Sequence, residues 1–96
     1  MIEVERLKVN EKVAIGLKVD LPGSPPLVSI IGEEGFIMCG FLNVEVAESL
    51  GTIAAVVSGV KTFDDVLEAE VKQATSKAQA RGIRQGMKGR EAIKLL

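Results

Sequence analysis

The stretch Gly35-Phe36-Ile37-Met38-Cys39-Gly40 decides the fold that this sequence predicts. It is a continuous apolar run between glycines, and it carries the single cysteine of the 96 residues. A short apolar run without alternation is typical of a strand that is covered on both faces, so we expect it at the centre of a sheet. Residues 27–31 form a second run of this kind, and the polar, glycine-bounded turn at 32–35 predicts that the two runs pair as a hairpin.

A second hairpin is predicted at the start of the chain. Residues 1–8 alternate imperfectly, and the phase slip at Arg6-Leu7 indicates a bulge. After a turn at Asn10-Glu11, residues 12–19 alternate cleanly between two faces. We expect the apolar face of this strand to be buried and the face with Lys12 and Lys18 to be wet. The apolar residues are Val13, Ile15, Leu17 and Val19.

The segment 22–26 is predicted to be a loop, because proline fixes φ and removes backbone donors. Such a rigid loop beside a sheet can form the rim of a pocket. Further along, Asn43 is a suitable cap for a short helix that ends at Gly51. The apolar run 53–57 predicts the next strand, and a strand, a helix and a strand in succession predict a right-handed crossover.

Three helices are predicted in the remaining chain. Thr62 and Asp65 have the spacing of a capping box, which predicts a helix start at residue 63. A narrow apolar stripe over residues 71–78 predicts a second helix that ends at Gly82. Residues 86–89 read as a turn, and residues 90–96 as a final short helix with Ile93 and Leu96 facing inward.

The order of elements is therefore predicted as β-β-β-β-α-β-α-α-α in a single α+β domain over residues 1–96. Strands followed by helices favour a two-layer sandwich. We expect a mainly antiparallel, five-stranded sheet with the helices on one face.

Composition excludes several functions. Without histidine, the chain has no Ser-His-Asp or Cys-His catalytic group, and one cysteine is a poor ligand set for zinc. The glycine-rich loops of P-loop and Rossmann proteins are absent, so we expect neither a metal nor another cofactor. With aromatic residues at 3%, the chain offers few platforms for stacking bases, and no nucleic-acid partner is expected.

The chain begins with a charged, alternating segment and has no apolar run of the ~18–20 residues that span a bilayer. We therefore expect a cytoplasmic protein with no membrane partner. Its charge is uneven. Residues 1–70 carry five lysine and arginine residues against twelve acidic ones, whereas residues 71–96 carry seven against Glu91 alone. This asymmetry indicates either an anion-binding face or helices that solvate themselves with basic side chains.

Cys39 and Gly40 are the first candidate site. A thiolate at a strand end, beside backbone N–H groups that could support a developing charge, would serve as a nucleophile or redox thiol. The alternative is that Cys39 is a small buried hydrophobe, as free cysteine often is. Gly40 follows directly on the predicted strand, which calls for a close approach of backbone or ligand. We favour the interpretation that these two residues form the wall of a site over the interpretation that Cys39 is its nucleophile.

The second candidate site is the segment Gly86-Met87-Lys88-Gly89-Arg90. A glycine turn that opens a helix presents free N–H groups, and Lys88 and Arg90 add positive charge, so phosphate or carboxylate could bind. Lys61-Thr62 offers a similar site at the start of another helix, and Arg81 and Arg84 could join either one. A cation at the acidic residues near 64–68 is the weaker idea, since helix capping explains them.

Three stretches together resemble the YunC-like family of small bacterial and archaeal proteins, a domain of unknown function. They are residues 35–40, the segment Gly59-Val60-Lys61-Thr62 before an acidic helix start, and Gly82-Ile83 followed by 86–92. The resemblance covers residues 25–96. It implies a two-layer α+β sandwich and supplies no activity.

No activity follows from the sequence, and three functions stay open. We favour a small-molecule or anion-binding domain that forms a homo-oligomer, because basic residues and helix starts gather near the C-terminus and sheet edges need protection. The first alternative is an enzyme with Cys39 as its nucleophile or redox thiol, with Lys61 or Arg90 stabilising charge. The second is a structural or protein-interaction module. A small anion is the expected ligand.

Overall fold

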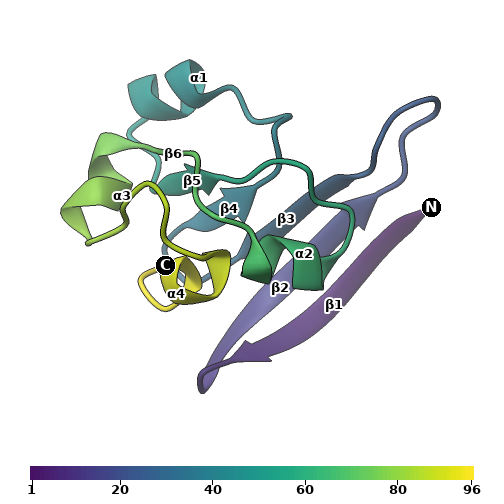
Figure 1. Ribbon diagram of the computed structural model, residues 1–96, viewed down its shortest axis with the longest axis horizontal. Coiled ribbons are helices and arrows are strands. Elements are labelled where there is room, and N and C mark those ends of the chain that lie inside the picture. The colour runs from purple at the N-terminus through teal and green to yellow at the C-terminus, as the bar shows by residue number, and fades with distance from the viewer.

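The computed structural model describes all residues, 1–96, as one α+β unit (Figure 1). Its sheet has six strands in the order β1-β2-β3-β4-β5-β6, and its four helices are short. The strands are β1 (Ile2–Val9), β2 (Lys12–Val19), β3 (Leu27–Ile31), β4 (Phe36–Met38), β5 (Ala54–Val56) and β6 (Gln73–Ala74). The helices are α1 (Val44–Ser49), α2 (Phe63–Glu68), α3 (Ser76–Ala80) and α4 (Gly89–Ile93).

The sheet is mixed. All neighbouring strands pair antiparallel except β4 and β5, which are parallel and joined by the crossover through α1. The β3–β4 hairpin and the β4-α1-β5 crossover confirm the predicted centre of the sheet. The prediction of five strands and of the order β-β-β-β-α-β-α-α-α is wrong, since β6 lies between α2 and α3.

Thr75 explains why a strand replaces the first half of the predicted helix over 71–82. Its hydroxyl accepts a hydrogen bond from the Ala78 N–H, which caps α3 and starts the helix only at Ser76. The same oxygen donates to the Thr52 carbonyl at 2.6 Å and accepts from the Ala54 N–H at 3.2 Å. These bonds hold the preceding residues against β5 as β6. The small residues at 74 and 75 fit this pairing as well as they fit a helix stripe.

The first hairpin forms as predicted, with one correction. Its register runs without interruption from Ile2↔Val19 to Val9↔Lys12, so the predicted bulge at Arg6-Leu7 is wrong. The turn residues Asn10 and Glu11 both have positive φ, at 50° and 71°, as a tight two-residue turn between twisted strands requires.

Local capping chemistry sets two helix starts where the sequence predicts them. The Asn43 side chain accepts a hydrogen bond from the Val46 N–H at the start of α1. Thr62 and Asp65 form a reciprocal capping box at the start of α2. Gly51 follows α1 with φ of 71°, as expected of a residue just past a helix end.

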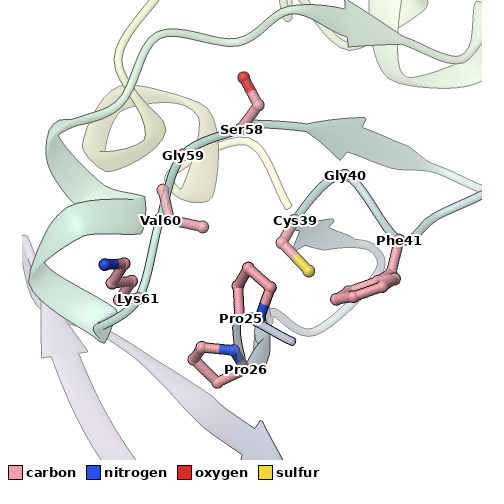
Figure 2. A pocket seen from close by; sticks show the side chains of 9 residues that line it. All are labelled: Pro25, Pro26, Cys39, Gly40, Phe41, Ser58, Gly59, Val60 and Lys61. Atoms are coloured by element: carbon pink, nitrogen blue, oxygen red, sulfur yellow. The ribbon is translucent and has the colours of Figure 1, made fainter. Parts of the chain in front are cut away.

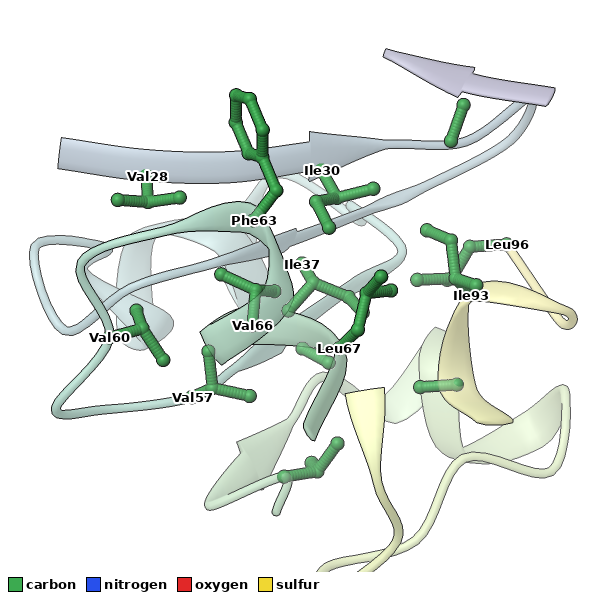
Figure 3. Close-up of a cluster of buried hydrophobic side chains, with 14 of the residues drawn as sticks. Val28, Ile30, Ile37, Val57, Val60, Phe63, Val66, Leu67, Ile93 and Leu96 are labelled. Atoms are coloured by element: carbon green, nitrogen blue, oxygen red, sulfur yellow. The ribbon is translucent and has the colours of Figure 1, made fainter. Parts of the chain in front are cut away.

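Helices α2 and α4 pack on one face of the sheet, over β3 and β4 (Figures 1 and 3). Gly16 shows where the covered face continues into β2, because a Cβ there would meet the Phe63 ring at 2.8 Å. The prediction that the apolar row of β2 is buried is therefore wrong. Ala14 and Gly16 face the helices, and the apolar row faces the other way. Small residues stand on the covered face of β2 because the Phe63 side chain occupies the space that larger side chains would need.

The side of the sheet away from α2 and α4 is here called the open face. In β1 to β4 it consists of alternate residues that the strand register places together. They are Ile2, Val4, Arg6, Lys8, Val13, Ile15, Leu17, Val19, Leu27, Ser29, Ile31, Phe36 and Met38.

Candidate functional site

A cavity of about 280 Å³ lies beside the opening stretch of the sequence, between the ends of β4 and β5 and the loop before β3 (Figure 2). Cys39 follows β4 directly, and Ser58 comes two residues after β5. Because these two strands are parallel, their carboxyl ends meet at the same edge of the sheet, which is where α/β units bind ligands. The lining residues are Pro25, Pro26, Cys39, Gly40, Phe41, Ser58, Gly59, Val60 and Lys61.

The Cys39 side chain is a wall of this cavity and is also part of the core. It is 5% exposed, and its sulfur accepts a hydrogen bond from the Val28 N–H at 3.5 Å. In Figure 2 the sulfur lies near the Phe41 ring and the Pro25 ring. No aspartate, glutamate or histidine lines the cavity, so no side chain there is suited to take a proton from the thiol.

Backbone donors around the cavity are unpaired. The N–H groups of Gly40 and Phe41, on one side, donate no hydrogen bond within the protein. The same holds for the N–H groups of Ser58, Gly59 and Val60 on the other side. Gly59 has φ of 72°, a left-handed conformation that turns successive N–H groups into an anion-binding concavity when they point the same way.

Gly40 has no structural explanation within the protein. A Cβ at this position would meet no atom within 4 Å, and its φ is outside the left-handed region. The close approach of another backbone segment is therefore absent, and a methyl group would project into open space beside the cavity.

Lys61 lines the cavity, whereas Thr62 does not. The N–H groups of both residues donate to the Asp65 carboxylate, at 3.0 and 3.2 Å, so the protein's own carboxylate fills that part of the predicted anion site. Thr62 serves as the cap of α2. The Lys61 ammonium forms no ion pair, and it is the one charged group among the lining residues.

The predicted anion site at residues 86–90 is also filled from within. Lys88 binds the Glu68 carboxylate of α2 at 3.3 Å, and Arg90 binds the other oxygen of the same carboxylate. Hydrogen bonds from Arg90 and then Lys88, together with their charges, lower the pKa of Glu68 below its usual 4.5. The two predicted anion-binding side chains thus hold α4 to α2.

Packing accounts for the glycine at the start of α4. A Cβ on Gly89 would lie 2.0 Å from the Val66 carbonyl oxygen, so only glycine allows α4 to approach α2 this closely. Its N–H donates to the Ala69 carbonyl at 2.8 Å. Gly86 has φ of 91° and makes the turn before it.

Arg81 and Arg84 join neither site. Arg81 binds Glu34 and the Leu95 carbonyl, and Arg84 binds the Gln79 carbonyl. Arg81 thus joins the C-terminal segments to the turn at Glu34, whereas Arg84 bonds within its own segment.

The structure thus brings Cys39, Gly40 and Lys61 together and leaves the segment 86–90 elsewhere. Pro25 and Pro26 form part of the rim, as the sequence suggested for their loop. Sequence reasoning missed Phe41, Ser58, Gly59 and Val60. The signal that could have found them is topological, because residues that follow two adjacent parallel strands meet at one edge.

No group of three or more cysteine, histidine, aspartate or glutamate side chains is placed to hold a metal ion. None of the helices has the length and apolar character needed to cross a bilayer.

Comparison with known proteins gives a family and no activity. Residues 38–96 match the family described as a domain of unknown function, DUF1805. The uncharacterized protein YunC of Bacillus subtilis (strain 168) is 31% identical over 97 residues, which are 97% of this chain and 95% of that protein. The crystal structure of a protein of unknown function, TA1206 from Thermoplasma acidophilum, superimposes with a TM-score of 0.93 at 41% identity. The match covers 98% of this chain and 91% of the TA1206 chain.

Proposed function

The chain belongs to the DUF1805 family, which has no assigned activity, and we propose from its own residues that it binds a small organic anion in the cavity beside Cys39. We propose further that it acts as a homo-oligomer. The ligand class is a carboxylate with a short apolar body. The apolar part would lie against the proline rings and Phe41, and the carboxylate against the unpaired N–H groups and Lys61.

One observation carries this proposal. The unpaired N–H groups at residues 40–41 and 58–60 surround an apolar cavity whose single charged group is the free ammonium of Lys61. The other basic, glycine-rich segment has its own carboxylate, Glu68, in place of a ligand. Because no carboxylate of the protein occupies this site, its N–H groups and the Lys61 ammonium are free to bind an anion from outside.

The size and lining of the cavity narrow the ligand further. Ligand cavities for larger molecules span about 300–1,000 Å³, so a cavity of about 280 Å³ suits a small body. A fully hydrated ion such as inorganic phosphate would leave the apolar walls unused. Short carboxylates with an apolar chain match both the apolar walls of the cavity and its N–H groups with Lys61.

The enzyme alternative has weaker support. Cys39 lies at the cavity, but its thiol is nearly buried and has no neighbouring base. Labelling of Cys39 with iodoacetamide as a function of pH distinguishes the two ideas. A thiol that reacts rapidly near neutral pH would favour a nucleophile, and slow labelling that butyrate slows further would favour a wall of the binding site.

The test of binding is a titration of the ¹⁵N-labelled protein with butyrate, inorganic phosphate and butanol, followed by amide chemical shifts. We expect butyrate to shift the amide signals of Gly40, Phe41 and residues 58–61 with a saturable profile. Butanol lacks the charge and phosphate lacks the apolar body, so both should bind more weakly. Saturable shifts centred on residues 86–90, or none at millimolar butyrate, would contradict the proposal.

A further inference from the structure

A second hollow, of about 450 Å³, lies beside the edge strand β6 and is here called the β6 hollow. One wall is β6 with Lys72 before it, and the opposite wall is formed by residues from the segment 79–85. Two backbone hydrogen bonds hold the walls together. The Gly86 N–H donates to the Val71 carbonyl at 2.9 Å, and the Val71 N–H donates to the Met87 carbonyl at 2.7 Å. The β6 hollow shares no lining residue with the ligand cavity described above.

The β6 hollow is basic and has no acidic side chain in its lining. Its two charged residues are Lys72 and Arg84, and neither takes part in any of the protein's ion pairs. The other polar side chains of the lining are the neutral amides of Gln73, Gln79 and Gln85. The positive charge of this hollow is therefore not neutralised by any side chain that lines it.

Arg84 is held in place while part of its guanidinium stays free. Its Nη1 donates to the Gln79 carbonyl at 2.8 Å and to the Ile83 carbonyl at 3.1 Å, which uses both hydrogens of that nitrogen. Its Nε and Nη2 form no hydrogen bond within the protein. Arg81 and Arg90 differ, because the Nε and Nη2 of each donate to acceptors of the protein. A guanidinium is planar, so fixing Nη1 restricts the direction of the free Nε–Nη2 edge.

This free edge is suited to an anion with two oxygens side by side. An arginine fork binds two oxygens of a carboxylate or a phosphate at once, through parallel N–H groups. Further donors stand next to it in the chain, because the backbone N–H groups of Arg84 and Gln85 donate no hydrogen bond to the backbone of the protein. Lys72 adds a second positive charge from the opposite wall.

Charge and size narrow the ligand to a phosphate monoester with a hydroxylated body. A phosphate monoester carries about −1.5 to −2 charges at pH 7, which matches two cations better than the single charge of a carboxylate does. The side-chain amides of Gln73 and Gln85 each offer donors and an acceptor, which are the partners that hydroxyl groups need. A volume of about 450 Å³ lies within the roughly 300–1,000 Å³ of small-molecule sites.

We infer that the β6 hollow is a second binding site, which takes a phosphate monoester of a small hydroxylated molecule such as a sugar. The phosphate lies on the free edge of Arg84 and near the Lys72 ammonium, and the hydroxyl groups face the glutamine amides. This site is separate from the cavity beside Cys39, and the inference does not depend on the proposed function.

The test is a titration of the full ¹⁵N-labelled chain with glucose 6-phosphate, followed by amide chemical shifts. We expect saturable shifts of the signals of residues 72–74 and 83–85. Inorganic phosphate should shift the same signals with a weaker affinity, and glucose should not shift them, because it lacks the charge. Glucose 6-phosphate and butyrate should bind at the same time, since their predicted sites have no residue in common.

Four variants separate the free edge of Arg84 from charge alone. Arg84→Gln should weaken glucose 6-phosphate binding at least tenfold, because a charged hydrogen bond is lost. Arg84→Lys keeps the charge and removes the fork, so it should weaken binding about fivefold. Lys72→Gln forms no altered contact within the protein and should weaken binding about fivefold. Lys94→Gln changes the net charge equally outside the hollow, and its affinity should stay within about twofold of wild type.

The amide spectrum of each variant without ligand shows whether it is folded, and Lys72→Gln keeps the test informative if loss of the Arg84 bonds unfolds the chain. Four results would overturn the inference. They are an absence of saturable shifts at millimolar glucose 6-phosphate, shifts confined to residues 40–61, displacement of glucose 6-phosphate by butyrate, and an equal loss of affinity in Lys94→Gln and Lys72→Gln.

Discussion

Two basic, glycine-containing segments of this protein resemble each other in sequence and differ in what they contact. At residues 86–90, Lys88 and Arg90 bind Glu68, and Gly89 lets α4 touch the backbone of α2. At the cavity, the Lys61 ammonium forms no ion pair, and a Cβ on Gly40 would meet no protein atom within 4 Å. The difference shows that a basic segment with glycine indicates contact with another group. That group can be part of the protein, as Glu68 is at residues 86–90, or it can be a ligand.

The largest effect is expected from Gly89→Ala. The added methyl group would lie 2.0 Å from the Val66 carbonyl oxygen, so α4 must move off α2. Because backbone cannot yield as a flexible side chain can, we expect the free energy of unfolding to fall by about 3 kcal/mol or more. Urea unfolding at pH 7 measures this loss.

Gly40→Ala is the matched control for that substitution. Its methyl group would meet no protein atom within 4 Å, and its φ suits alanine. The unfolding free energy should stay the same or rise by about 0.4–1 kcal/mol, since alanine restricts the unfolded chain. Equal effects at the two glycines would remove the contrast between packing and an open site.

The next effect concerns the two lysines. Lys61→Met removes the one charge at the cavity while keeping most of the side-chain volume. Hydrogen bonds to charged groups contribute about 1.5–3 kcal/mol, so we expect butyrate affinity to fall about tenfold or more. Lys88→Met, which removes a cation already paired with Glu68, should change it less than twofold. Calorimetric titration at low salt gives both values, and the reverse ranking would assign the ligand to residues 86–90.

The smallest effect is expected from Glu68→Gln. In the folded protein the hydrogen bonds from Arg90 and Lys88 lower the pKa of Glu68 below 4.5, its value in an unfolded chain. The group therefore adds stability that is complete above pH 4.5 and is lost as the pH falls through the lower folded pKa. Wild type should be more stable than Glu68→Gln at pH 7, and the two should converge in strong acid.

Urea unfolding between pH 2 and 7 measures that difference. Glu48 also has a lowered pKa, because the Ser76 hydroxyl and N–H bind it, but this contribution is common to both proteins and cancels. Butyrate affinity should be unchanged in Glu68→Gln, and a clear loss of affinity would place Glu68 at the ligand site.

Sequence was sufficient for the features that depend on neighbouring residues. The first hairpin turn, the caps at Asn43 and Thr62 and the central β3–β4 hairpin are each determined by a few adjacent side chains. It was insufficient for β6, because an apolar stripe of small residues fits a helix and an edge strand equally well. The long-range bonds of Thr75 decide between the two.

The alternation in β2 correctly separated its residues into two faces. The prediction that the apolar face packs on the core was wrong, because the face with Ala14 and Gly16 does so. The pattern could not include Phe63, which is distant in sequence and fills the space above Gly16. For the site, the sequence selected Cys39, Gly40 and Lys61, but whether they converge depends on which strands are parallel. The same limit made residues 86–90 look like a ligand site, because Glu68 precedes them by many residues.

The Thr75 hydroxyl has a consequence for the order of folding. It joins residues 52 and 54 to the start of a five-residue helix, across 23 and 21 residues of sequence. A helix this short is unstable alone, so α3 persists only after its cap is held by β5. We do not expect the C-terminal segments to serve as a folding nucleus. We therefore expect them to form after the β4–β5 pair and the cavity at its end.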